Sequence, residues 1–167
     1  MTPNVRLTVP QTDEQHQMLS YLLSISGTEG GIDPYARDDD MAFWLIDTEA
    51  FNVDTSGKPY YVTAGYTAIS CIDNVARRCR GMLWVHPDFR GKGIATEALK
   101  KRNAMLFDEM NMHRIEWVVP IENDARLHIA TKLGQRREGV LKEAVYYNGR
   151  YHDLVCFATL RSERQGY

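Results

Sequence analysis

A short glycine-containing segment near the middle of the chain has the composition of an anion-binding loop. The segment 90–96 has the sequence RGKGIAT and lies between an apolar run, Met82–Val85, and a long stretch with helical periodicity. Glycine lets the backbone approach a ligand closely, and the first N–H groups of a helix have no acceptor within the helix. These N–H groups and the positive end of the helix dipole favour phosphate. The spacing therefore predicts either a phosphate-binding loop or a plain surface turn rich in glycine.

Comparison with phosphate-loop patterns narrows the choice of ligand. A P-loop requires GxxxxGK followed by Ser or Thr, but here a glycine follows Lys92. A dinucleotide-binding fingerprint requires GxGxxG, but Thr96 occupies the position of the third glycine. A third pattern, Arg/Gln-x-x-Gly-x-Gly/Ala, is filled by Arg90, Gly93 and Ala95. The small residues of this pattern would let the backbone lie against a pyrophosphate.

Three sequence blocks around this loop follow the order typical of one family. Residues 80–99, RGMLWVHPDFRGKGIATEAL, resemble motif A of the GNAT acetyltransferases, which bind acetyl-CoA. Residues 113–141 resemble the strand and helix that follow motif A, and residues 138–161 resemble the C-terminal hairpin of the RimJ/RimL-like branch. The resemblance implies a single α+β domain over residues 1–167. Its sheet would be mixed and mostly antiparallel, with a parallel strand–helix–strand core that binds CoA.

The resemblance also implies which residues hold acetyl-CoA, the expected cosubstrate. The backbone of Val85 would contact the pantetheine arm. Asn123 matches an asparagine that lies near the pantetheine in many relatives, and Lys132 would lie close to the far end of the cofactor. The alternative for Lys132 is a solvated helix lysine. The residues expected to hold the pyrophosphate are Arg90, Gly91, Lys92, Gly93, Ile94, Ala95 and Thr96. Lys92 would add charge, and no aromatic neighbour is expected to pack against it.

The acceptor side of the expected site departs from the family pattern. Many GNAT enzymes carry a tyrosine acid at the position of Ala130, although the RimJ/RimL-like branch often lacks it. Arg126 replaces a serine, and Gln135 replaces a phenylalanine, that this pattern often contains. Because an ammonium must lose a proton before it attacks a thioester, a base or a water chain is expected. Glu116 is the predicted catalytic base, and the alternative is a surface carboxylate paired with Arg114.

The resemblance implies an acetyl-CoA-dependent N-acetyltransferase that transfers the acetyl group directly to a primary amine. The acceptor would be a protein N-terminus, a lysine or a small amine, and the run Asp38–Asp40 could select a cationic acceptor. The alternative is a non-catalytic acyl-CoA-binding regulatory module on the same fold. A nucleic-acid binder that uses the cluster Arg77–Arg80 is disfavoured by the near-neutral net charge. No metal site is expected.

Hydrophobic periodicity predicts the elements that position these residues. The stretch from Ile94 to about Asn111 has an apolar stripe with a period of 3.6 residues, and places Lys100, Lys101, Arg102 and Asn103 mostly on the polar face. Two other helices are expected at about Asp13–Ser26 and Ala125–Leu133, the second with an Asn123-Asp124 cap and a closing Gly134. A turn is expected at Phe51–Pro59. Strands are expected at Val5–Val9, Ala42–Ile46, Tyr60–Ile72, Arg80–Val85 and Arg114–Val119, and a hairpin with an Asn148-Gly149 turn joins Val140–Tyr147 to Tyr151–Leu160.

The composition of the chain limits the class of protein to which it can belong. The chain has 167 residues and a formal net charge of −2, which suits one globular domain without a global attraction to nucleic acid or membranes. The N-terminus lacks the apolar segment of a signal peptide, and no apolar run is long enough to span a membrane. Three cysteines without a CxxC pair predict small apolar packing residues in the reducing cytoplasm. The exposed edge of the hairpin could pair two copies as a homodimer.

Overall fold

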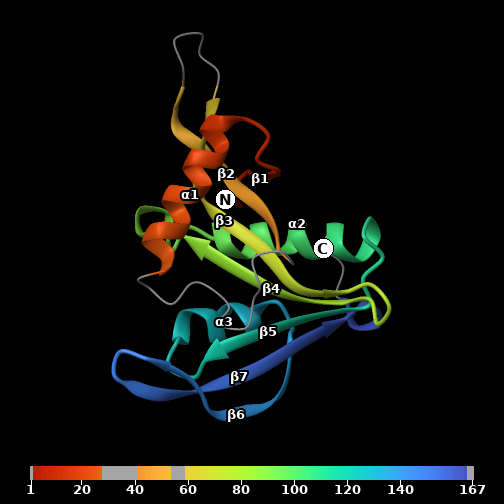
Figure 1. Ribbon diagram of the computed structural model, residues 1–167. Helices are drawn as coiled ribbons and strands as arrows, with labels where there is room; N and C mark the ends of the chain where they lie inside the picture. The colour runs from red at the N-terminus through yellow and green to blue at the C-terminus, as the bar shows by residue number, and fades with distance from the viewer. Residues whose placement is uncertain (1, 28–40, 54–58, 165–167) are drawn as a thin grey trace. The chain divides into compact units, whose positions relative to one another are not determined.

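The computed structural model describes residues 2–27, 41–53 and 59–164 (Figure 1). In these residues the chain forms one mixed sheet with the strand order β1-β2-β3-β4-β5-β7-β6. Its strands are β1 (Val5–Thr8), β2 (Ala42–Val53), β3 (Pro59–Asp73), β4 (Arg78–Val85), β5 (Arg114–Pro120), β6 (Arg136–Tyr147) and β7 (Arg150–Leu160). The helices are α1 (Asp13–Gly27), α2 (Ile94–Asp108) and α3 (Asp124–Lys132), with 3-10 turns η2 (Pro87–Phe89) and η3 (Arg161–Glu163).

The pairing of β4 with β5 is the parallel pair expected from the crossover helix. The register joins Arg78 to Arg114 and ends at Arg80 and Glu116. Helix α2 lies between these two strands in the sequence, as a parallel connection requires. The pairs β1–β2, β5–β7 and β6–β7 are antiparallel. The predicted α+β class, with a mixed and mostly antiparallel sheet around a parallel strand–helix–strand core, is confirmed.

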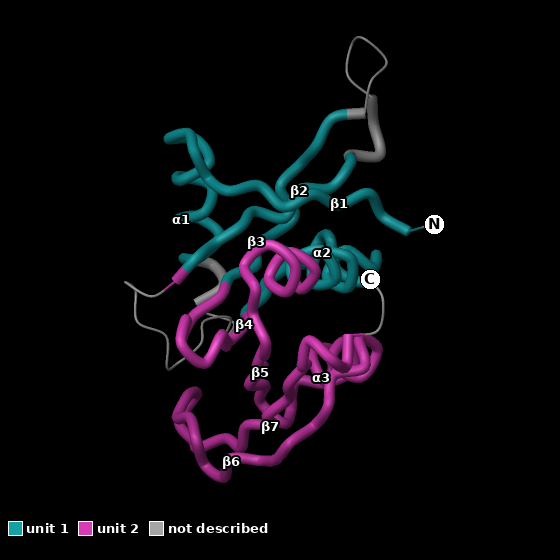
Figure 2. The backbone as a smooth tube through the Cα atoms, turned by 90° about the vertical axis from the view of Figure 1, so that its right-hand side faces the viewer, with its two compact units in different colours: residues 1–32, 42–68, 82–102 teal, residues 33–41, 69–81, 103–167 magenta. Residues whose placement is uncertain are grey.

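The chain divides into two compact units (Figure 2). Each unit contains buried apolar side chains. Unit 1 comprises residues 1–32, 42–68 and 82–102, and unit 2 comprises residues 33–41, 69–81 and 103–167. Burial of apolar side chains is the main favourable term in the folding of each unit. The largest fully buried apolar side chains are Val5, Leu45, Ile46, Tyr66 and Leu99 in unit 1, and Ile69, Leu106, Phe107, Ile115, Val119 and Val155 in unit 2.

The predicted elements agree with the structure except at several ends. Helix α2 ends at Asp108 and not near Asn111, which has a φ of 54°. The turn predicted at 51–59 was wrong at both ends, because β2 continues to Val53 and β3 begins at Pro59. Residues 54–58 and the run Asp38–Asp40 lie outside the described residues. No helix within the described ranges is long and apolar enough to cross a bilayer.

The structure contains the predicted hairpin turn, and it buries two of the three cysteines at least in part. Asn148 and Gly149 both have positive φ, 50° and 79°, as the predicted Asn-Gly turn requires. Cys79 is buried and Cys156 is half-buried, as expected of small packing residues. Cys71 is exposed and has a φ of 50°, so the prediction that it packs in the interior was wrong.

Candidate active site

The glycine loop of unit 1 lies between β4 and α2, as the sequence predicts. Gly91 and Gly93 have φ values of 75° and 80°, which residues with a side chain rarely adopt. The Gly93 carbonyl accepts a hydrogen bond of 3.1 Å from the Glu97 N–H. The helical hydrogen-bond pattern therefore begins immediately after the loop. The two glycines therefore make the sharp turn that places the loop directly before the first turn of α2.

The first turn of α2 offers backbone N–H groups to a ligand. Because the helix begins at Ile94, the N–H groups of residues 94–96 have no acceptor within it. Ile94 and Thr96 are 3% and 8% exposed, which leaves their side chains little access to an anion. A Cβ added at Gly91 would meet no atom within 4 Å, and one at Gly93 would meet only Pro3, at 3.5 Å. The loop thus has open space beside its backbone, which suits a phosphate held by amide groups.

Two exposed cations are anchored to the same loop. The Arg90 Nε donates a hydrogen bond of 2.9 Å to the Val85 carbonyl. The Lys92 Nζ donates one of 2.8 Å to the Asp88 carbonyl and lies 5.4 Å from the centre of the Phe89 ring. The expectation that Lys92 lacks an aromatic neighbour was therefore wrong, because the η2 turn brings Phe89 close. Such a contact contributes about 0.5–1 kcal/mol at an exposed site and holds the charge beside the loop.

The end of β4, which includes Val85, is shaped by a glycine that the sequence analysis did not single out. Gly65 on β3 faces the β4 backbone, and a Cβ there would lie 2.2 Å from the Trp84 carbonyl oxygen. The His86 N–H donates to the Ala64 carbonyl at 2.9 Å, which holds β3 against this end of β4. An isolated glycine inside a predicted strand was the available signal, since it often marks a close approach of two backbones.

Arg102 lies in the interior and not on the polar helix face where the sequence pattern placed it. It is fully buried in unit 1, and its NH1 group donates to the Thr67 hydroxyl and the Met82 carbonyl, both at 3.1 Å. The Thr67 hydroxyl also donates to the Met82 carbonyl at 2.7 Å. Asn103 is fully buried as well, so the prediction that these two residues lie on the polar face of the helix was wrong. Positions 94, 98, 102 and 106 share one helix face, and this spacing was the signal that Arg102 points inward.

Unit 2 holds the other residues that the sequence associated with the cofactor. Asn123 is the N-cap of α3, and its Oδ1 accepts the N–H of Arg126 at 3.1 Å. The NH2 group of the same amide is not used in that contact. Lys132 is exposed in the last turn of α3, where a cation interacts favourably with the helix dipole. Ala130 is fully buried, so this position offers no side chain for proton transfer.

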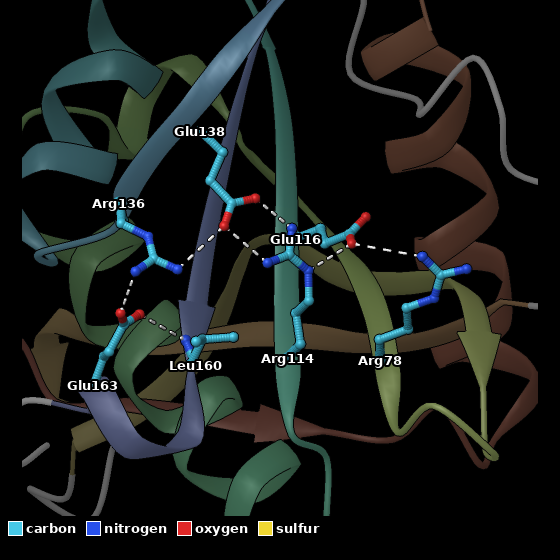
Figure 3. Close-up of polar contacts among 7 residues, drawn as sticks. All are labelled: Arg78, Arg114, Glu116, Arg136, Glu138, Leu160 and Glu163. Carbon is cyan, nitrogen blue, oxygen red and sulfur yellow. Dashed lines mark hydrogen bonds and ion pairs between the residues drawn. The ribbon is translucent and has the colours of Figure 1, made fainter.

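Glu116 belongs to a row of alternating charges on unit 2 (Figure 3). Its Oε1 accepts a hydrogen bond of 2.8 Å from the Arg114 Nε and lies 3.9 Å from the Arg78 NH1. The ion pair with Arg114 that the sequence suggested as an alternative is thus present. Glu116 Oε2 takes part in neither contact. The row consists of Arg78, Glu116, Arg114, Glu138, Arg136 and Glu163.

Contacts within this row shift the pKa values of Glu138 and Arg114. The Arg114 guanidinium holds the pKa of Glu138 at about 2, and the hydrogen bond to Glu138 raises the pKa of Arg114. Burial raises the pKa of the Cys156 thiol, which keeps this cysteine protonated and disfavours it as a nucleophile. The Glu138 carboxylate is therefore ionised, and the neighbouring Cys156 is not an activated thiol.

Comparison with known proteins agrees with this arrangement. A model of the GNAT acetyltransferase domain matches residues 2–136. Spermidine N(1)-acetyltransferase of Escherichia coli K12 is 33% identical over 92 residues, which cover 55% of this chain and 50% of that protein. YdaF of Bacillus subtilis, which is named as a provisional ribosomal N-acetyltransferase, is 29% identical over 102 residues, which cover 61% of this chain and 56% of YdaF. The matched stretch thus spans about half the length of these relatives.

Solved structures show the same fold. The crystal structure of spermidine N-acetyltransferase from Vibrio cholerae in complex with CoA and spermine superposes with a TM-score of 0.73 and 19% identity. The match covers 95% of this chain and 96% of the other. Strand order, the parallel pair and the glycine loop before α2 are the features expected of this fold. The family match over residues 2–136, together with the fold, shows that the chain belongs to the GNAT acetyltransferase domain family.

Proposed function

We propose that the chain transfers the acetyl group of acetyl-CoA to a primary amine, by direct attack of the amine on the thioester. The observation that carries this proposal is the loop with two positive-φ glycines that opens directly onto the first turn of α2. Acetyl-CoA supplies the activated acyl group. The loop fits its pyrophosphate, because open space, unpaired backbone N–H groups and two anchored cations occur together.

The residues proposed to hold the cosubstrate are those that the resemblance to the family implies. In unit 1, the loop Arg90–Thr96 would bind the pyrophosphate, and the backbone of Val85 would contact the pantetheine arm. In unit 2, Asn123 would donate its side-chain NH2 group to the pantetheine, and Lys132 would lie near the far end. Fixing the thioester in this way supports catalysis by positioning, which can supply a large part of the rate enhancement without a covalent intermediate.

Glu116 is the proposed proton acceptor for the amine. Arg114 holds Oε1 and so orients the carboxylate, while Oε2 is the oxygen that would take the proton, directly or through water. The buried Ala130 supports this choice, since the tyrosine found at that position in many relatives is missing. The departing thiolate of CoA would then be protonated from solvent.

We infer the class of the amine acceptor from the names of the relatives. One relative is named for spermidine and another for ribosomal N-acetylation, so we infer that the acceptor is a small amine, a lysine or a protein N-terminus. We also infer a cytoplasmic location from the three free cysteines. A screen of polyamines, aminoglycosides, amino acids and peptides, read as CoA thiol release with mass detection of the acetylated product, tests the proposal. If none of these amine classes causes release of the CoA thiol, the proposal is contradicted.

A non-catalytic acyl-CoA-binding module is the second candidate. The ion pair between Glu116 and Arg114 favours it, because a carboxylate that only stabilises the sheet would leave the chain without a base. CoA binding by calorimetry without thiol release in any amine pool would identify such a module.

A homodimer through the edge of the hairpin is a further proposal, to be tested by light scattering. In the described sheet, β6 is an outer strand. Its register shifts between Leu141 and Val145, and Lys142 and Glu143 lie within that irregularity. Such features oppose edge-to-edge pairing, so pairing would be expected outside residues 141–145.

A further inference from the structure

His152 on β7 is a buried titratable residue for which the proposed chemistry has no use. Its side chain is only 3% exposed. The ring stacks on that of Tyr147, with the centroids 3.7 Å apart and the planes inclined by 13°. Its Nδ1 lies 3.0 Å from the Glu122 Oε1, and its Nε2 lies 3.2 Å from the backbone carbonyl of Tyr147. Both ring nitrogens therefore face an oxygen.

The two oxygens can only accept hydrogen bonds. The pKa of Glu122 is lowered by its hydrogen bond to His152, so the carboxylate is ionised, and a backbone carbonyl has no proton to donate. A neutral imidazole carries one N–H, whereas an imidazolium carries two. Both contacts are hydrogen bonds only in the imidazolium form. After loss of one proton, the remaining N–H would stay with the carboxylate, because a charge-assisted bond is the stronger one.

Among the described residues, two charged groups other than Glu122 belong to the strand of His152 and lie close to it in the sequence. The Arg150 NH2 lies 3.9 Å from the Glu122 Oε1 and competes with His152 for the same oxygen. Asp153, the next residue on β7, directs its carboxylate to the Lys142 Nζ and the Glu143 N–H, at 2.7 and 2.9 Å. The partners of the His152 ring are thus Glu122 and Tyr147, with Arg150 acting through Glu122.

These contacts join two segments that are distant in the sequence. Glu122 lies in the turn between β5 and α3, and Tyr147 lies at the end of β6 beside the hairpin turn. The same turn is held to β7 by a hydrogen bond of 3.0 Å from the Ile121 N–H to the Asp153 carbonyl. Asn123, the next residue after Glu122, caps α3. His152 therefore fastens the turn that positions Asn123.

We propose that His152 is a positioning residue that, when both ring nitrogens are protonated, clamps the turn 121–123 to the hairpin and so orients Asn123 toward the cosubstrate. The last part rests on the proposed function, in which Asn123 contacts the pantetheine arm. The clamp is complete while both ring nitrogens carry a proton, and it loses one hydrogen bond when either proton is lost.

Amide hydrogen exchange tests the clamp without any ligand. Protection factors of the Ile121, Asn123 and Arg126 amides, corrected for the intrinsic pH dependence of exchange, are measured by NMR from about pH 5.5 to 8. In the wild type we expect protection to fall by up to about tenfold across this range. His152→Gln and Glu122→Gln should both give lower protection at low pH and a flat profile. His113→Gln, a control at an exposed histidine, should retain the wild-type profile.

The clamp is refuted if wild-type protection does not change with pH, or if His152→Gln retains the wild-type profile. Should His152→Gln fail to fold, Glu122→Gln carries the same test, because this side chain is 44% exposed and its replacement leaves the core intact.

Calorimetric CoA affinity over the same pH range tests the link to the cosubstrate. The phosphates of CoA titrate equally with both proteins, so the ratio of the His152→Gln Kd to the wild-type Kd isolates the effect of His152. This ratio should be several-fold at low pH and approach one at high pH. A constant ratio would overturn the link to Asn123. If the wild type does not bind CoA, the proposed function fails, while hydrogen exchange still decides on the clamp.

Discussion

Arg114 on β5 reaches across β7 to Glu138 on β6 and forms two parallel hydrogen bonds, NH1 to Oε1 at 2.9 Å and NH2 to Oε2 at 2.5 Å (Figure 3). The strand between them carries Ala158, which is paired with Glu116 on one side and Arg136 on the other. A bidentate pair of this kind combines charge with fixed geometry.

The Arg114–Glu138 pair predicts a specific loss of stability in acid. The pKa of Glu138 falls from 4.5 to about 2 in the folded protein, so its contribution is full above about pH 4.5 and is lost as pH falls toward 2. Glu138→Gln should lower the free energy of unfolding at pH 7 by about 1 kcal/mol, since the side chain is partly exposed and solvent screens the pair. Urea melts at several pH values should show a shallower acid slope for this variant than for the control Glu109→Gln. Equal slopes would contradict the pairing.

Replacement of Glu116 tests the proposed base. Glu116→Gln retains the shape but cannot accept a proton, so we expect kcat to fall by about 10²–10⁴-fold with CoA affinity nearly unchanged. The acid limb of the pH–rate profile should disappear. Glu138→Gln is the matched control, because it removes a carboxylate from the same row and leaves Glu116 in place. A Glu116→Gln enzyme with near-normal turnover and the wild-type pH profile would indicate water-mediated deprotonation instead.

A branched side chain at Gly93 should weaken CoA binding. The φ of 80° is a strained conformation for valine, and the side chain would also occupy the open space beside the loop. Calorimetry should show CoA affinity reduced by more than tenfold, that is, by more than about 1.4 kcal/mol. Gly149→Val at the hairpin turn has nearly the same φ, 79°, and should lose stability without losing CoA affinity. If both variants bind CoA equally well, the loop does not hold the pyrophosphate.

Lys92 should contribute charge to cosubstrate binding. Its Nζ is held beside the loop by the Asp88 carbonyl and the Phe89 ring. Lys92→Ala is expected to raise the KM for acetyl-CoA with little change in kcat, the pattern of uniform binding, and the effect should shrink at high salt. Steady-state kinetics at two ionic strengths, with Lys101→Ala as the control, provide the measurement. If the KM is unchanged at low salt, Lys92 does not contribute to acetyl-CoA binding and is a surface residue that only aids solubility.

Gly65 should tolerate no side chain. A Cβ at this position would lie 2.2 Å from the Trp84 carbonyl oxygen and 2.9 Å from the Val85 Cα, and both are backbone atoms that cannot rotate away. Gly65→Ala is therefore expected to destabilise the protein by about 1–3 kcal/mol. Thermal melts should show no comparable loss for Gly139→Ala, because a Cβ there meets no atom within 4 Å. A Gly65→Ala protein with wild-type stability would mean that β3 and β4 separate easily.

Local sequence patterns predicted most of the helices and strands, although not all of their ends, and the backbone turn of the glycine loop. The glycines at 91 and 93 required a sharp turn, the apolar period after Ile94 required a helix, and Asn148-Gly149 required a tight hairpin turn. The Asn123 cap of α3 was predicted in the same way and is present. Each of these features depends on the backbone preferences of residues within a few positions of one another, and such preferences are readable from the order of the residues.

Contacts between distant residues were decided only by the tertiary structure. Glu116 meets Arg78, and Arg114 meets Glu138, because the strand order and register bring together residues far apart in the sequence. Arg102 is buried because its helix face packs inward, whatever its charge. His152 acquires two acceptors because the hairpin folds beside the turn before α3. The chemistry of a side chain depends on its neighbours in space. Strand register and helix rotation determine those neighbours, and both are properties of the whole fold.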